Sequence, residues 1–135
     1  MKTLYGLIVA LSTVVALVLT GSGANAASSS VGKNNFYGTC DAQAHVSDAT
    51  TSGKVEVFGG WGCQVNKYFT GTLVCAIWVN GSEKFRTTKD ILLASSRDCA
   101  VTYPDYSSSD SYVGKVIIKG QGGTNFTLTT GAIRT

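Results

Sequence analysis

Four cysteines in a short chain constrain the fold more than any other feature. They are Cys40, Cys63, Cys75 and Cys99, separated by 22, 11 and 23 residues in a chain of 135. A zinc site needs ligands at shorter spacing, and His45 is the single histidine, so we expect two disulfides and no metal. Three connectivities are possible. We favour Cys40–Cys63 with Cys75–Cys99, in which each bridge closes a loop of about two dozen residues.

The N-terminus predicts export to an oxidising compartment. Lys2 precedes an almost wholly apolar stretch, residues 4–20, and small residues follow up to the triplet Ala24-Asn25-Ala26. This order is typical of a secretory signal peptide cleaved after residue 26. An uncleaved anchor is the alternative, because about 17 apolar residues is the lower limit for crossing a bilayer. With cleavage, we expect a secreted, extracellular protein without a membrane span, in which cysteines oxidise.

The rest of the chain has the composition of a β protein. Beyond residue 26 it contains 13 Thr, 13 Gly and 10 Val but only four Leu, which favours strands joined by tight turns. Residues 27–35 have no periodic apolar pattern, so we expect a flexible leader there. Residues 36–135 should form the domain. Its expected strands are 36–46, 55–65, 68–79, a partner strand after residue 81, 91–94, 99–103, 112–119 and 125–133.

Three local signals refine this prediction. The pair Gly59-Gly60 interrupts a strand and suggests a bulge, while Trp61 falls on the buried side. Asn80-Gly81 predicts a hairpin turn, because both residues tolerate a positive φ. A bulge beside this turn would align Phe85 with the face that carries Ile77. A tight turn at residues 66–67, an exposed loop at 103–111 and a glycine-rich turn at 120–123 complete the expected connections.

The expected fold is therefore all-β: a small antiparallel β-sandwich of about seven strands with two disulfides. The order Cys63, Trp78, Cys99 resembles immunoglobulin domains, which implies an immunoglobulin-like architecture. However, Arg97 stands where that family has a tyrosine. The chain is also similar to α-amylase inhibitors of the tendamistat type, which are small secreted sandwiches with two disulfides formed in sequence order. Their Trp-Arg-Tyr triplet is absent, so the similarity implies no inhibitory residue.

Charge and motifs exclude several partners. The chain has 11 basic and eight acidic side chains, too few cations for a nucleic-acid binder. Gly59, Gly60 and Gly62 precede no helix start and predict no phosphate cradle. We expect no cofactor. Two sequons, at Asn80 and Asn125, matter only where the source cell glycosylates.

Candidate catalytic residues are few. His45 is expected to point outward on a flat strand face beside Asp41 and Gln43, where nothing tunes a catalytic base. The possible carboxylate pairs for glycoside hydrolysis lie in polar stretches typical of solvated turns. They are Asp41 with Asp48, Asp90 with Asp98, and Asp105 with Asp110. We expect no catalytic site.

The outer face of the predicted sandwich carries the candidate binding surface. Trp78, Val74 and Phe58 are expected there, with Lys84 and Arg86 as a cationic rim. Exposed apolar side chains rimmed by cations often mark an interaction surface, although packing within the second sheet would hide them.

These features predict a small secreted binding protein that acts without catalysis. Its partner would be an extracellular protein or an envelope or glycan component, as for an inhibitor of a secreted hydrolase or a toxin-like or antimicrobial factor. A carbohydrate-binding module is the alternative, with Trp78 and either Tyr68 or Tyr112 as the aromatic platform. A small hydrolase that uses His45 is the second alternative.

Overall fold

Strands account for almost all regular structure in this protein. The computed structural model describes residues 27–64, 67–107, 109–121 and 125–135, and these ranges contain nine strands and no helix. The strands are β1 (Ser28–Tyr37), β2 (Cys40–Ser47), β3 (Lys54–Cys63), β4 (Phe69–Val79), β5 (Ser82–Ala94), β6 (Ser96–Pro104), β7 (Ser111–Gly120), β8 (Asn125–Thr129) and β9 (Ile133–Arg134).

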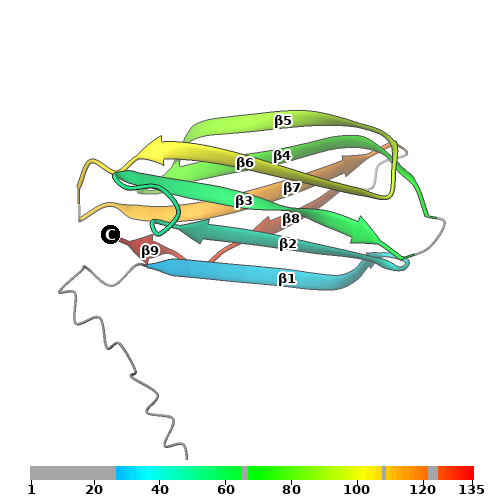
Figure 1. Cartoon of the computed structure of the whole chain (residues 1–135), viewed down its shortest axis with the longest axis horizontal. Coiled ribbons are helices and arrows are strands. Elements are labelled where there is room, and N and C mark those ends of the chain that lie inside the picture. Colours follow the sequence, from blue (N-terminus) through cyan, green and yellow to red (C-terminus); the bar gives the residue numbers. More distant parts are fainter. Residues whose placement is uncertain (1–26, 65–66, 108, 122–124) are drawn as a thin grey trace, which may run out of the picture.

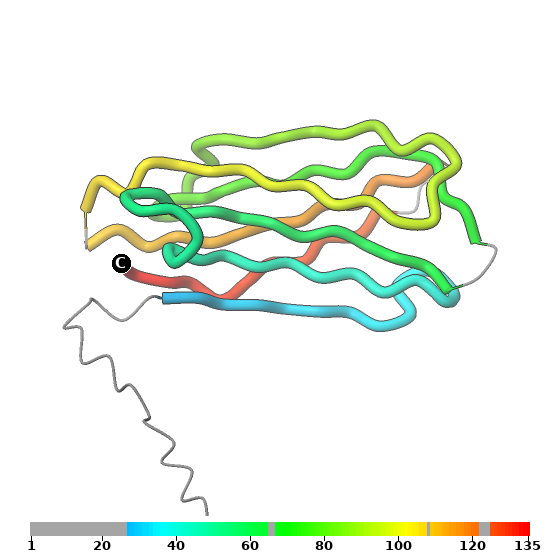
Figure 2. The backbone as a smooth tube through the Cα atoms, viewed as in Figure 1, coloured from blue at the N-terminus to red at the C-terminus, as the bar shows by residue number. Residues whose placement is uncertain are grey.

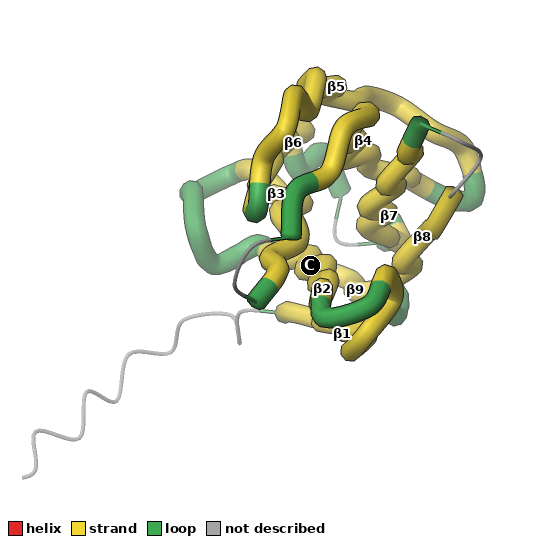
Figure 3. Tube along the Cα trace, turned by 90° about the vertical axis from the view of Figure 1, so that its right-hand side faces the viewer, coloured by secondary structure: helices red, strands yellow, loops and turns green. Residues whose placement is uncertain are grey.

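The strands form two antiparallel sheets that face each other (Figure 1). Sheet A has the order β1-β2-β3-β6. Sheet B has the order β5-β4-β7-β8, and the short β9 also pairs with β7. The end-on view of Figure 3 shows β5 beside β6 along one edge and β1 beside β8 along the other. The predicted all-β sandwich is confirmed.

The core lies between the inner faces of the two sheets. β3 shows how alternation produces it, because Val55, Val57 and Trp61 are each at most 4% exposed while Glu56 and Phe58 face outward. Trp61 meets Phe69 of sheet B edge-on, with ring centroids 5.4 Å apart. The prediction that Trp61 is a core residue is confirmed.

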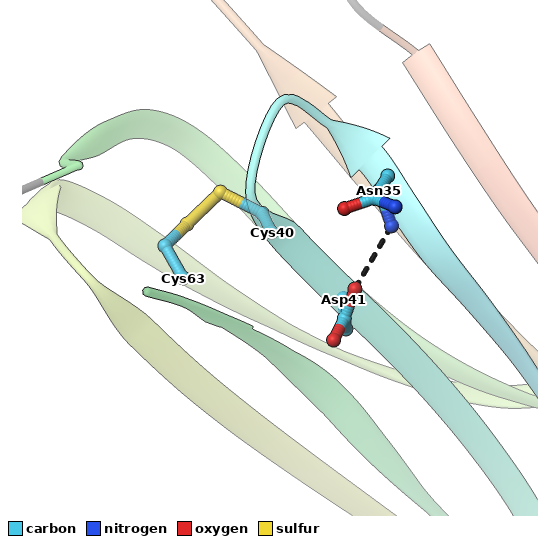
Figure 4. The surroundings of a disulfide bond; sticks show 4 residues. All are labelled: Asn35, Cys40, Asp41 and Cys63. Carbon is cyan, nitrogen blue, oxygen red and sulfur yellow. Dashed lines mark hydrogen bonds between the residues drawn. A yellow bond between two sulfur atoms is a disulfide. The ribbon is translucent and has the colours of Figure 1, made fainter. Parts of the chain in front are cut away.

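The two disulfides have different structural roles. Cys75–Cys99 joins β4 of sheet B to β6 of sheet A through the core. Cys40–Cys63 joins the neighbouring strands β2 and β3 at one end of sheet A (Figure 4). This is the predicted pairing, and it is consistent with an oxidising environment. The signal-peptide prediction concerns residues 1–26, which lie outside the described residues.

The N-terminal strand differs from the sequence prediction. Residues 27–35, expected to be a flexible leader, instead form most of β1, which pairs with β2 from Ser28↔Ser47 to Tyr37↔Cys40. The expected single strand 36–46 is divided by a turn at Gly38, whose φ is +59°. The physical reason is that β2 has a second edge to be paired, and the chain folds back at Gly38 to pair it.

The Gly59-Gly60 pair does not form the expected bulge. The register of β3 is unbroken against β2 on one side and against β6 on the other. A Cβ at Gly59 would lie 2.9 Å from Ala44 Cα, and one at Gly60 would lie 2.8 Å from Asp98 Cα. The two glycines therefore allow close approach of the neighbouring backbones on both sides of a continuous strand.

The Asn80-Gly81 turn is confirmed, with φ values of +51° and +82°. A register shift between Ile77 and Trp78 leaves Phe85 opposite Ile77, as predicted. Phe85 is nevertheless 57% exposed, because β5 is the edge strand of sheet B.

A second irregularity lies near the end of β5. Phe69 of β4 pairs with Ala94, but Gly71 pairs with Ile91, so β5 carries one extra residue there. Leu93 lies in this bulge with a φ of +43°. Parts of the expected turn at residues 66–67, of the loop 103–111 and of the turn 120–123 fall on residues that the structure does not describe.

Candidate ligand-binding groove

The five residues predicted to form one binding surface lie on two opposite faces of the sandwich. Trp78 and Val74 of β4 and Arg86 of β5 face outward from sheet B, and Lys84 is the exposed extra residue beside the hairpin. Phe58 faces outward from sheet A. Val74 is only 3% exposed and cannot contact a ligand. The structure therefore does not bring the five residues together.

The charged residues near Trp78 already have partners within the protein. Lys115 of β7 places its Nζ 3.6 Å from the centroid of the Trp78 ring, a cation–π contact. Arg86 donates from Nε to Glu83 Oε1 at 2.6 Å and from Nη2 to Glu83 Oε2 at 2.7 Å. Hydrogen bonding from Arg86 lowers the pKa of Glu83. The Arg86 side chain expected in a cationic rim is thus engaged with its neighbour.

The predicted aromatic platform is not formed either. Tyr112 is fully buried, and its hydroxyl donates to Asp105 Oδ1 at 3.1 Å. Tyr68 is 61% exposed, but it precedes β4 whereas Trp78 is near the other end of that strand. At ~3.3 Å per residue the two rings are roughly 30 Å apart.

A groove of about 680 Å³ lies instead on the outer face of sheet A and is lined by residues of all four strands. Its floor consists of backbone and small side chains, because Gly60 and Gly62 occupy the outward positions near the C-terminal end of β3. Gly32 of β1 and Ala100 of β6 extend this floor to both sides. The hollow therefore exists because glycine and alanine occupy outward positions where larger side chains would otherwise cover the sheet.

Polar side chains surround this floor. Gln43 and Asp98 flank Gly60 in one row of cross-strand pairs, and Asp41 is opposite Gly62 in the next. The Asp41 carboxylate is held by the backbone N–H of Asn35, which donates to Oδ1 at 2.8 Å (Figure 4). The carboxylates accept hydrogen bonds and the Gln43 amide donates and accepts them, so these residues offer both donors and acceptors to a ligand. Arg97 is the cross-strand partner of the buried Trp61, so its side chain lies on the other side of β6 from Asp98.

An aromatic pair borders the groove. Phe58 and His45 are cross-strand neighbours whose rings stack with centroids 4.7 Å apart. Phe58 lines the groove and also a second hollow of about 210 Å³, in which His45 and the serines of β1 take part. The outer face of sheet A thus carries two adjacent hollows that share one aromatic ring.

His45 faces outward, as expected. Ser30 is its cross-strand partner in β1, but no hydrogen bond joins the two side chains among the described residues. Neither residue is therefore arranged as an activated nucleophile and base.

Several of the candidate carboxylates serve the backbone or the turns. Asp48 accepts from the N–H of Ala27 at 2.7 Å, and Asp110 accepts from Asn80 Nδ2 at 2.8 Å. Asp105 accepts from the hydroxyls of Tyr112 and Thr135. Within the described ranges, no group of three or more His, Cys, Asp or Glu side chains is placed to hold a metal ion.

Comparison of the chain with known protein families, with curated proteins and with solved structures found no match. The described residues contain no helix that is long and apolar enough to cross a membrane.

Sequence reasoning missed the groove. Its elements were visible separately, since Phe58, Gly60 and Gly62 alternate on the outward side of one strand. That alternation of small outward residues was the available signal. Asp98, however, is placed beside Gly60 only by the pairing of β3 with β6, which local patterns do not predict.

Proposed function

We propose that this protein is a secreted, disulfide-stabilised binding protein and that the groove on sheet A holds a neutral oligosaccharide. The groove carries the proposal, because it combines an open glycine floor, one aromatic ring and a mixed set of polar side chains. Secretion is supported by the signal-like N-terminus and by the two disulfides.

The polar set suits sugar hydroxyls, which both donate and accept hydrogen bonds. The carboxylates of Asp41 and Asp98 accept, and the Gln43 amide both donates and accepts. Among the described residues, the side chains of Gln43 and Asp98 make no hydrogen bond within the protein. These groups are therefore available to a ligand.

The remaining features suit the ring and the length of an oligosaccharide. Phe58 offers an aromatic surface against which the C–H face of a sugar ring can pack. A volume of about 680 Å³ falls within the usual range of ligand sites. Four strands at ~4.8 Å spacing span roughly 14 Å, which favours an oligosaccharide over a single sugar.

The test is to fill the groove without disturbing the sheet. Gly62 has an ordinary strand conformation, and a Cβ added there would meet only Ser96 Cβ at 3.9 Å. Gly62→Thr should therefore fold normally while its side chain blocks the floor. We expect the natural protein to bind one of a panel of neutral oligosaccharides by isothermal titration calorimetry, and Gly62→Thr to lose that binding.

A matched pair of phenylalanine variants provides the control. Phe58→Ala should weaken binding about tenfold through loss of ring contact. Phe85→Ala, which truncates a 57% exposed ring on the other sheet, should leave binding unchanged. Binding that is insensitive to both Gly62→Thr and Phe58→Ala would place the ligand elsewhere. If the protein bound none of the sugars but captured one secreted protein, the ligand would be a protein partner, as for an inhibitor, and the glycan proposal would be wrong.

A further inference from the structure

Large apolar side chains are exposed mainly at one end of the sandwich. Of six such side chains in the described ranges, four are at the end that carries the β1–β2 turn and the β5–β6 connection, on the right in Figure 2. They are Tyr37 at 38% exposure, Tyr68 at 61%, Leu92 at 76% and Leu93 at 71%. We call these four residues the apolar tip.

The apolar tip is held together by the start of β4. The Tyr37 ring packs edge-on against Phe69, with centroids 5.6 Å apart. Tyr68 is the preceding residue, and the backbone N–H of Leu93 donates to Thr70 Oγ1 at 3.2 Å. The four exposed side chains therefore surround one short segment and protrude from the same end.

Leu93 is held in a conformation that a leucine rarely adopts. Its φ of +43° lies in the left-handed region, where glycine is favoured. The bulge that imposes this φ turns two consecutive leucines toward solvent. Such strain usually persists where an exposed residue serves a function, since glycine would be better for folding alone.

The net positive charge of the described residues is also concentrated at this end. Lys67 places its Nζ 4.6 Å from the centroid of the Tyr37 ring. The last rows of cross-strand pairs at this end, with the adjoining Lys67, contain four cations and two carboxylates. The cations are Lys33, Lys67, Arg97 and Lys119, and the carboxylates are Asp41 and Asp90. The other described residues contain six cations and six carboxylates, so the surplus positive charge belongs to the end with the apolar tip.

We propose that the apolar tip inserts into an anionic lipid surface. Tyrosine favours the headgroup region, leucine favours the acyl region, and cations are attracted to anionic headgroups. The tip consists of separate exposed side chains at the ends of β1 and β5 and just before β4. A fluid lipid surface adapts to them, whereas a protein partner needs a complementary surface of about 800 Å². This proposal is independent of ligand binding in the groove.

The test is sedimentation of the secreted protein with vesicles of phosphatidylcholine alone and with vesicles containing equal phosphatidylglycerol. We expect binding to the anionic vesicles only, weakened by added salt. Leu93→Gly should reduce the affinity about tenfold, because it removes one inserted side chain. The same variant should keep or raise the melting temperature, because glycine relieves the strained φ. A merely structural role for Leu93 would lower both.

Two further variants complete the experiment. Leu92→Ser should weaken binding to a similar extent, whereas Phe85→Ser, at an exposed site away from the tip, should not. Absence of binding to anionic vesicles, or equal binding by all variants, would overturn the proposal. A concentration-dependent dimer that Leu92→Ser abolishes, with no vesicle binding, would assign the tip to a second copy of the chain instead.

Discussion

Removing the two disulfides one at a time should reveal their unequal structural roles. The bridges close loops of nearly equal size, with sequence separations of 23 and 24 residues. The chain-entropy model therefore assigns each about 3 kcal/mol of stabilisation. On this basis alone, the double variants Cys40→Ala/Cys63→Ala and Cys75→Ala/Cys99→Ala would lose the same stability.

Packing distinguishes the two sites. Cys75 and Cys99 are 0% and 2% exposed between the sheets, where no backbone hydrogen bonds cross the core. Their truncation leaves a cavity that adds about 1–2 kcal/mol to the loss. Cys40 is also fully buried, but Cys63 is only half-buried at the end of sheet A, so truncation there leaves a smaller cavity, and the β2–β3 ladder still joins the two strands. We therefore expect a loss of about 5 kcal/mol for the inter-sheet pair and about 3 kcal/mol for the other.

Urea denaturation followed by tryptophan fluorescence measures both values by linear extrapolation. A stability of 5–15 kcal/mol is typical of a domain, so both double variants should retain a measurable transition or lose it in the stated order. Equal losses, or a larger loss for Cys40→Ala/Cys63→Ala, would refute the reasoning from packing. The control is the natural protein with both bridges intact.

Three other predictions follow from the backbone and from one buried phenol. Gly60→Ala should cost more than about 2 kcal/mol in urea denaturation, because its Cβ meets the β6 backbone, whereas Gly62→Ala should change stability by less than about 0.5 kcal/mol. Gly81→Ala should cost about 1 kcal/mol and lower the melting temperature, because φ is +82° there. Burial, assisted by the hydrogen bond to Asp105, raises the pKa of Tyr112 to about 12. The unfolded chain releases this proton near pH 10, so the stabilising contribution is complete below pH 10 and is lost as the pH rises to about 12; ultraviolet titration should detect one late tyrosinate, absent in Tyr112→Phe.

The sequence predicts the parts of the fold that depend on local patterns. Alternation places Val57 and Trp61 in the core, and the Asn80-Gly81 pair requires a turn with positive φ. In each case the physical cause acts within a few residues of the chain.

Features that depend on neighbouring strands could not be predicted in this way. The segment 27–35 has little pattern of its own and becomes a strand because β2 offers it a partner. Val74 follows the outward alternation of β4, yet side chains of β5 and β7 on both sides bury it. The candidate groove needs Asp98 beside Gly60, a proximity created by the sheet order alone.

The irregular end of β5 also affects how molecules of this protein meet one another. β5 is 13 residues long and forms an edge of sheet B, so a regular version would present a long row of unpaired backbone groups. The bulge at Leu93 interrupts that row at one end, a second register shift beside Lys84 interrupts it near the other, and charged side chains line the strand between them. These irregularities shorten the edge that another copy could pair with, so a variant with a straightened β5 should be more prone to edge-to-edge association.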